Sequence, residues 1–257
     1  MPYSGIDVSQ HQGRIDWGMV AKSGIRYAML RIASSNENGL YIDIEFTRNI
    51  REAAKNGVKV GVYWYTYATT IKQLRKEWEF VFAELKKHKL QMPVAYDIEY
   101  EPSILALPKS ERTKLAAEAC RLIEAAGYYA MIYCSCDFYK SKLDYKKLAK
   151  YDVWIAHYKG TTHDDCPVEP GIWQYSSRGY VPGMACNFDL DIFYKAYDKI
   201  CKPVGGDLDN PVAPSSKAAL RKIIVGPMSN GDYDTIKPKI DKIAAEIGNI
   251  SVNVEEV

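Results

Sequence analysis

Short apolar runs alternate with amphipathic stretches of helical spacing from the N-terminus to about residue 200. This alternation is typical of strand–helix units arranged around a parallel sheet. The apolar runs predict strands at Ser4–Val8, Tyr27–Ile32, Val58–Tyr65, Val94–Ile98, Tyr129–Tyr133, Val153–Ala156, Ile172–Tyr175 and Asn187–Leu190. Eight parallel strands, each followed by a helix, are the number that closes a β/α barrel.

The amphipathic stretches predict helices at Glu45–Asn56, Ile71–His88, Ser110–Ala126 and Tyr145–Lys150. Gly57 and Gly127 follow two of these stretches, where glycine commonly ends a helix. No long helical stretch separates the last three strands. The pattern therefore predicts an α/β fold over residues 1–201, a distorted β/α barrel of five strand–helix units plus three strands.

A change of composition marks the end of the barrel. Residues 202–216 contain three prolines and two glycines among polar residues, which predicts a linker. Beyond it, the pattern predicts a small βαβ module over residues 217–257, with its elements at Leu220–Val225, Asp234–Ile247 and Ile250–Val254. So short a unit buries little surface, so we expect it to form a homodimer with a second copy or to pack on the barrel.

Charge and composition exclude several classes of partner. The formal net charge of +2 comes from 34 basic and 32 acidic residues, far from the basic surface that nucleic-acid binding requires. There is no apolar run long enough for a membrane span. The first residues lack the pattern of a signal peptide, so we expect synthesis in the cytoplasm and, for any wall substrate, action after release.

The six cysteines and four histidines show neither CxxC nor HExxH spacing, which predicts no metal and no cofactor. In the reducing compartment expected for this chain, the cysteines are predicted to be reduced thiols.

Active sites of parallel barrels lie at the carboxyl ends of the strands. The residues that close the apolar runs are acidic, aromatic or polar: Asp7, Tyr63, Tyr65, Asp97, Glu99, Tyr133, His157, Tyr158, Gln174, Tyr175 and Asp189. Strand alternation places Asp97 and Glu99 on one face. Crowded, buried carboxyls divide into a proton donor of raised pKa and partners that stay charged, which is what glycosidic cleavage needs. Tryptophans such as Trp64, Trp154 and Trp173 offer flat faces for sugar rings.

Carboxyls two residues apart are common in this chain, so spacing alone does not identify the site. Asp43-Ile44-Glu45 repeats the tripeptide at 97–99, but it precedes a predicted helix, where Asp43 is expected to cap the helix or order the loop. Asp191 is expected to begin the helix after the eighth strand. From the residues alone, Asp97 and Glu99 are either catalytic or a solvated strand end.

A longer set of motifs resembles the family 25 glycoside hydrolases, the Chalaropsis-type lysozymes of phage endolysins and bacterial autolysins. In chain order these are Gly5-Ile6-Asp7-Val8-Ser9 with Gln12, Ile15-Asp16-Trp17, Tyr41 with Asp43, Gly61-Val62-Tyr63-Trp64-Tyr65, Pro93-Val94-Ala95-Tyr96-Asp97-Ile98-Glu99, Tyr133, Trp154-Ile155-Ala156, Trp173-Gln174-Tyr175-Ser176 and Pro182-Gly183 before Asp189. The resemblance covers residues 3 to 200 and implies the same distorted barrel.

The resemblance also implies an activity: retaining hydrolysis of the bond from N-acetylmuramic acid to N-acetylglucosamine in bacterial peptidoglycan. By the same resemblance, Glu99 is the general acid and later the general base. Asp97 either orients the substrate's 2-acetamido group or acts as the nucleophile. Asp7 and Asp189 support the acidic cluster, and the remaining positions implied to bind substrate are Tyr63, Tyr65, Tyr133, Trp154, Trp173 and Gln174.

Two other functions stay open at this point. A chitinase-like barrel hydrolase would carry DxxDxDxE, but Met92 and Ala95 stand where the first two acids belong. A catalytically inactive wall-binding protein would have no physical need for a self-repelling acidic cluster. In the tail, Ile224-Val225-Gly226-Pro227 resembles half of a sporulation-related repeat, which implies a module that binds the cell wall or dimerises.

Overall fold

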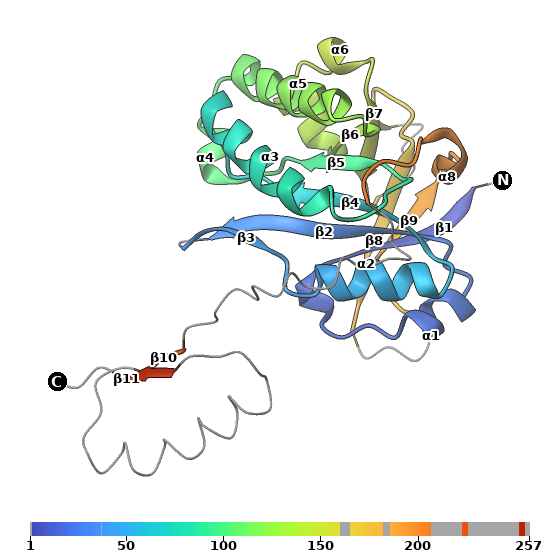
Figure 1. Cartoon of the computed structure of the whole chain (residues 1–257). Helices are drawn as coiled ribbons and strands as arrows, with labels where there is room; N and C mark the ends of the chain where they lie inside the picture. Colours follow the sequence, from blue (N-terminus) through green and yellow to red (C-terminus); the bar gives the residue numbers. More distant parts are fainter. Residues whose placement is uncertain are drawn as a thin grey trace. The chain divides into compact units, whose positions relative to one another are not determined.

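The computed structural model describes residues 2–36, 38–159, 165–181, 186–206, 223–225 and 252–254. The chain divides into two compact units, Met1–Leu208 and Asp209–Val257. The first unit contains a sheet surrounded by helices, and the second contains a pair of short strands (Figure 1). Each unit is described by itself below.

Within the described part of the first unit, eight strands close into a barrel. They are β1 (Tyr3–Val8), β2 (Tyr27–Asn36), β4 (Lys59–Tyr65), β5 (Val94–Asp97), β6 (Ala130–Ser135), β7 (Asp152–Ala156), β8 (Ile172–Gly179) and β9 (Phe188–Phe193). The ring closes because β1 pairs with β2 on one side and with β9 on the other. Strand β9 is antiparallel to both of its neighbours, while the other barrel pairs are parallel. The predicted α/β barrel is confirmed.

A ninth strand of this sheet, β3 (Gly39–Ile42), was not predicted. It forms an antiparallel hairpin with the end of β2, where Ser34 pairs with Tyr41. Serines and asparagines near the end of β2 interrupt the apolar run, so the sequence pattern ends at Ile32 although the strand continues to Asn36. The hairpin lengthens β2 beyond the barrel edge (Figure 1).

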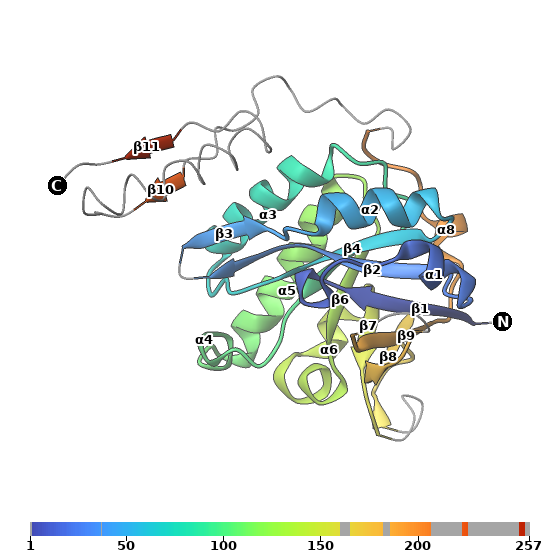
Figure 2. The same cartoon turned by 90° about the horizontal axis from the view of Figure 1, so that it is seen from below.

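Helices cover the outside of the barrel (Figure 2). The longer ones are α2 (Phe46–Lys55), α3 (Ile71–Leu85) and α5 (Lys109–Ala125), and the shorter ones are α1 (Trp17–Lys22), α4 (Pro102–Leu105), α6 (Tyr145–Leu148) and α8 (Tyr197–Ile200). Four of them, α2, α3, α5 and α6, follow the predicted positions, whereas α1 and α4 were not predicted. Helix α3 begins at a capping box in which the Thr70 hydroxyl accepts from Gln73 N at 3.2 Å. Gly57 and Gly127 have φ of 79° and 88°, which confirms both predicted helix stops.

Two apolar clusters lie on the two faces of the barrel wall. The larger one packs strands against helices, with residues such as Val62, Leu74 and Ile132. The smaller one fills the barrel interior with Met29, Ala95, Met131 and neighbouring aromatic rings. Because side chains alternate along a strand, these interior positions continue towards the carboxyl ends as Arg31, Asp97 and Tyr133. The apolar interior therefore supports a polar layer above it.

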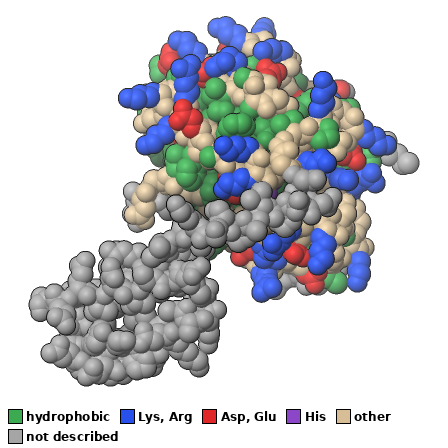
Figure 3. Space-filling view, in the orientation of Figure 1, with side chains coloured by type: hydrophobic (Ala, Val, Ile, Leu, Met, Phe, Trp, Pro, Cys, Tyr) green, Lys and Arg blue, Asp and Glu red, His purple; other side chains and the backbone are tan. Residues whose placement is uncertain are grey.

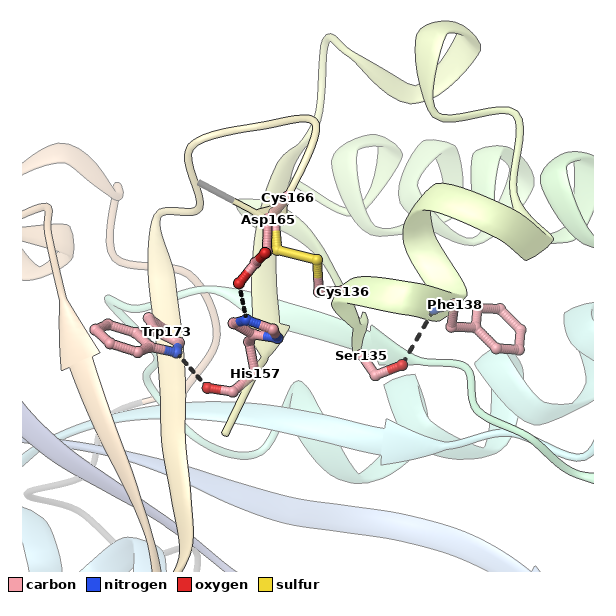
Figure 4. Close-up of a disulfide and its surroundings, with 7 residues drawn as sticks. All are labelled: Ser135, Cys136, Phe138, His157, Asp165, Cys166 and Trp173. Carbon is pink, nitrogen blue, oxygen red and sulfur yellow. Dashed lines mark hydrogen bonds and ion pairs between the residues drawn. A yellow bond between two sulfur atoms is a disulfide. The ribbon is translucent and has the colours of Figure 1, made fainter. Parts of the chain in front are cut away.

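The prediction of reduced cysteines is wrong for one pair. Cys136 and Cys166 form a disulfide with a Cα–Cα distance of 5.6 Å (Figure 4). Cys136 directly follows β6, and Cys166 lies in the connection after β7, the strand beside β6. The pairing depends on this adjacency, which a separation of 30 residues in sequence does not reveal. Within the described residues, Cys120, Cys134, Cys186 and Cys201 are free.

The start of the predicted linker stays on the barrel. Val204 and Leu90 exchange two backbone hydrogen bonds of 2.9 and 2.8 Å, and Gly206 N donates to Lys86 O. In the second unit, β10 (Ile223–Val225) and β11 (Val252–Val254) pair in parallel. The helix predicted between them, at 234–247, lies outside the described residues. Of the helices that the structure describes, none is both long and apolar enough to cross a membrane.

The surface agrees with the near-neutral net charge. Figure 3 shows Lys and Arg side chains both at the outline and near the centre of one face of the barrel, with Asp and Glu side chains among them. No single basic patch occupies the described part of that face.

Candidate active site

A cavity of about 310 Å³ opens at the carboxyl ends of the barrel strands. Its lining includes nine of the ten predicted site residues: Asp7, Tyr63, Tyr65, Asp97, Glu99, Tyr133, Trp154, Gln174 and Asp189. They come from β1, β4, β5, β6, β7, β8 and β9, or directly follow these strands. The barrel therefore brings together residues that are up to 182 positions apart in the sequence.

Asp97 and Glu99 form the first acidic group of the cavity. Asp97 ends β5 and is 2% exposed, and its Oδ1 has no hydrogen-bond partner among the described residues. Burial and the neighbouring Glu99 raise the pKa of Asp97 well above its usual value, while Arg31 acts in the opposite direction. Burial, Glu101 and Asp189 raise the pKa of Glu99 to about 7. Glu99 therefore carries a proton over a large part of the neutral range.

Asp7, Asp189 and Asp191 form a second acidic group across the cavity. In the antiparallel pair of β1 and β9, Asp7 stands opposite Asp189, and Gly5 stands opposite Asp191. The pKa of Asp7 is raised well above its usual value by burial, then by Asp191 and Asp189. Burial also raises the pKa of Asp191 to about 8, and the neighbouring Asp189 acts in the same direction. Crowded, buried carboxyls of this kind hold their protons to higher pH than isolated ones.

The expected role of Asp191 at a helix start is wrong. The chain stays extended through Ile192 and Phe193, because these residues pair with Ser4 and Tyr3 of β1. Asp191 thus points to the same face as Asp189, where its Oδ1 accepts from Trp154 Nε1 at 2.8 Å.

Gln174 connects the second acidic group to two tyrosines. Its Nε2 donates to Asp7 Oδ2 at 2.7 Å, and its Oε1 accepts from Tyr133 OH at 2.9 Å and Tyr158 OH at 2.6 Å. Gln174 is 2% exposed, so these three bonds fix the direction of its amide. The network positions Asp7 and leaves Asp97 and Glu99 outside it.

Aromatic rings complete the walls. Tyr133 and Tyr63 pack on Trp154 with centroid distances of 4.3 and 5.6 Å. Tyr65 OH donates to Glu101 Oε1 at 2.6 Å, next to Glu99. Burial raises the pKa of both Tyr63 and Tyr133 well above its usual value, so both hydroxyls stay protonated as donors.

Trp173, the tenth predicted residue, does not line the cavity. It precedes Gln174 on β8, so alternation turns its ring to the opposite face of the strand. There its Nε1 donates to His157 O at 2.8 Å (Figure 4), and its ring contacts Tyr175.

The cavity also contains residues that were not predicted as its substrate or catalytic groups: Ser9, His11, Gln12, Arg31, Tyr158 and Ser177. Arg31 could have been found, because it shares its strand face with Tyr27 and Met29. Its Nε donates to Asp43 Oδ2 at 2.9 Å, and Asp43 also accepts from the backbone N–H groups of Gln10 and Glu45. The loop-ordering role expected for Asp43 is confirmed.

Comparison with known proteins agrees with this geometry. Residues 6–184 match the profile of the glycosyl hydrolases family 25. The chain is 28% identical over 211 residues to the uncharacterized protein YegX of Escherichia coli K12, covering 80% of this chain and 75% of that protein. It is 27% identical over 190 residues to the autolytic lysozyme of Clostridium acetobutylicum, covering 74% of this chain and 55% of the relative.

Among solved structures, the modular autolysin LytC of Streptococcus pneumoniae superposes with a TM-score of 0.66 at 25% identity. The match covers 75% of this chain and 47% of LytC. Because the family profile matches residues 6–184, which span most of the barrel, the chain belongs to the glycosyl hydrolases family 25.

Proposed function

We propose that this glycoside hydrolase cleaves the β-1,4 bond between N-acetylmuramic acid and N-acetylglucosamine in bacterial peptidoglycan, with retention at the anomeric carbon. The observation that carries the proposal is the pKa of Glu99, about 7, beside a buried Asp97 in an open, aromatic cavity. The names of two relatives support the substrate: one is an autolytic lysozyme, and LytC has been solved with a synthetic peptidoglycan ligand.

In the first step, the protonated Glu99 donates its proton to the glycosidic oxygen while the bond from that oxygen to the anomeric carbon breaks. Positive charge develops on the anomeric carbon. Asp97 stabilises this charge in one of two ways, by bonding the N–H of an attacking 2-acetamido group or by attacking the carbon itself. The unpartnered Asp97 Oδ1 favours the first way, because an amide N–H would satisfy it.

In the second step, Glu99 acts as the base. Its carboxylate takes a proton from the incoming water, whose oxygen attacks the anomeric carbon from the side that the leaving group occupied. As this bond forms, the bond made in the first step, from the anomeric carbon to the acetamido oxygen or to the Asp97 carboxylate, breaks. This step restores the protonated Glu99 and completes retention. Across the cavity, the bonded pair of Asp7 and Gln174 presents fixed polar groups to the sugar.

The test is digestion of purified peptidoglycan, followed by mass spectrometry of the reduced fragments. Fragments with N-acetylmuramic acid at the new reducing end are expected. The variant Glu99→Gln should lower turnover by about 10²–10⁴-fold, the usual contribution of a general acid. The control Glu111→Gln removes an exposed carboxyl from the first turn of α5 and should retain full activity.

Three results would contradict the proposal in different ways. New ends of N-acetylglucosamine identify a glucosaminidase, and release of chitin oligomers in preference to wall fragments identifies a chitinase-like enzyme. Absence of any fragments identifies a wall-binding protein without activity. Retained activity in Glu99→Gln shows that another group supplies the proton.

For the second unit, we propose cell-wall binding or homodimerisation through residues 217–257. The parallel pairing of β10 with β11 supports a βαβ arrangement. Light scattering of the full chain measures its mass, and sedimentation with insoluble peptidoglycan measures binding. The comparison is a chain that lacks residues 217–257. If it keeps both the number of chains per assembly and the fraction that sediments with peptidoglycan, both roles are contradicted.

A further inference from the structure

A cluster of metal-binding side chains lies beside the active-site cavity. Atoms of Cys136, His157 and Cys166 that can bind a metal are all within 4.8 Å of one another. Asp165 lies against them, with its Oδ2 2.8 Å from His157 Nε2. Figure 4 shows the imidazole next to the disulfide, with the Asp165 carboxylate between the ring and the chain after β7. The same carboxyl ends of β6 and β7 that form the cavity therefore bring these four residues together.

We propose that the reduced Cys136–Cys166 pair and His157 bind one zinc ion, with Asp165 bonded to the imidazole as a supporting carboxylate. Zinc accepts two thiolates and an imidazole as ligands, and a water molecule can complete the tetrahedral arrangement. A dithiol reductant opens the site: the protein disulfide becomes two thiols while the reductant becomes a disulfide. Zinc then displaces the two thiol protons to solvent as both sulfurs become thiolates.

The imidazole is held in place independently of the sulfurs. His157 N donates to Gln174 O at 3.0 Å, and His157 O accepts from Trp173 Nε1 at 2.8 Å. Both bonds anchor the His157 backbone to β8, so its side chain remains beside Cys136 when the disulfide opens. Only 19% of the His157 side chain is exposed. Fixed position and partial burial are what a ligand needs to bind an ion with little ordering cost.

The site has a direct connection to the cavity. Tyr158 follows His157 and donates to Gln174 Oε1, which also accepts from Tyr133. A disulfide or a zinc ion at Cys136 and Cys166 each ties the connection after β7 to the end of β6. Either crosslink thus braces the cavity wall that carries Tyr158, whereas the reduced, metal-free chain lacks this brace.

The experiment uses the full chain, reduced with a phosphine and freed of metal with a chelator. Co²⁺ serves as the spectroscopic probe, because tetrahedral Co²⁺ bound to thiolates absorbs intensely, and Zn²⁺ then displaces it. We expect one Co²⁺ per reduced chain, none for the oxidised chain, and a rise in unfolding temperature when Zn²⁺ is added to the reduced chain.

Variants separate this site from other thiols. Cys136→Ser and His157→Ala should lose the thiolate–Co²⁺ absorption, and Asp165→Asn should weaken binding by about 10–100-fold, as loss of a supporting carboxylate does at other metal sites. Cys186→Ser removes a half-buried free thiol outside the cluster and should bind Co²⁺ as the wild type does. The proposal is overturned if the reduced wild type binds no Co²⁺ or if Cys186→Ser loses binding as fully as Cys136→Ser.

Discussion

Replacing Asp43 by Asn tests how the wall of the cavity is held. Both oxygens of Asp43 are used: Oδ2 accepts from Gln10 N and Arg31 Nε at 2.9 Å each, and Oδ1 accepts from Glu45 N at 3.0 Å. The Asp43 side chain is 1% exposed and that of Arg31 is 10% exposed, so the ion pair is buried. Asn has a single acceptor oxygen. In Asp43→Asn the NH₂ group therefore takes the place of one carboxylate oxygen and faces an N–H donor.

The expected loss of stability follows from this geometry. Removing one partner of a buried ion pair costs about 3–5 kcal/mol, since the remaining charge loses its compensation. Arg31 bonds Asp43 through its Nε, and its Nη2 has no hydrogen-bond partner among the described residues. For a domain of this size, each kcal/mol shifts the unfolding temperature by roughly 2–4 °C, so the total shift is roughly 6–20 °C.

Thermal and urea unfolding of the full chain measure the effect. The matched control is Asp16→Ala, because Asp16 is an exposed N-cap whose side chain accepts only from Met19 N. Loss of such a cap costs about 1 kcal/mol. If Asp43→Asn costs no more than Asp16→Ala, the buried ion pair contributes nothing to stability and Asp43 only orders the loop.

Further predictions concern protons and hydrogen bonds in the cavity. Folding raises the pKa of Glu99 from its usual value of 4.5 to about 7. The protonated Glu99 therefore stabilises the fold fully below about pH 4.5, and this stabilisation is lost as the pH rises through 7. Glu99→Gln should therefore unfold at a higher temperature than wild type at about pH 8 and at the same temperature at about pH 4; a constant difference contradicts the assigned pKa. Wild-type kcat/KM should also fall above about pH 7, as Glu99 loses the proton it donates, and a rate profile that stays level to about pH 9 excludes this acid. Gln174→Leu should lower kcat/KM by removing three hydrogen bonds, whereas Tyr175→Phe on the outer face should not, and equal effects would show that the amide network is dispensable. Asp191→Asn removes a charge that raises the pKa of Asp7, so carboxyl NMR titration should show the pKa of Asp7 falling, and an unchanged titration refutes the coupling.

Local patterns were sufficient to predict the barrel and most of the cavity. The strands that contain Asp97 and Tyr133 carry a continuous apolar run before these residues, and parallel strands bring their carboxyl ends to one edge. Asp97 and Glu99 are two residues apart, so strand alternation alone predicts that both carboxyls lie on the same face. Each of these inferences depends on residues that are close in sequence.

The features that were missed depend on register or on neighbouring strands. Asp191 belongs to the acidic group because β9 continues along β1, and only that pairing distinguishes it from a helix start. The Cys136–Cys166 disulfide depends on the adjacency of β6 and β7. Trp173 was assigned to the cavity with Gln174, although adjacent residues of one strand cannot share a face.

The balance of charge in the cavity explains why its carboxyls hold protons before substrate binds. Arg31 is the one guanidinium that lines the described cavity, and its Nε is bonded to Asp43 outside the acidic groups. Arg31 lowers the pKa of Asp97, but burial outweighs this effect, and burial raises the pKa of Asp7 as well. In the proposed reaction, the positively charged anomeric carbon brings a cation to these carboxyls, and it exists only near the transition state. The same burial that disfavours ionised carboxyls in the free enzyme thus makes the site complementary to the transition state rather than to the neutral sugar.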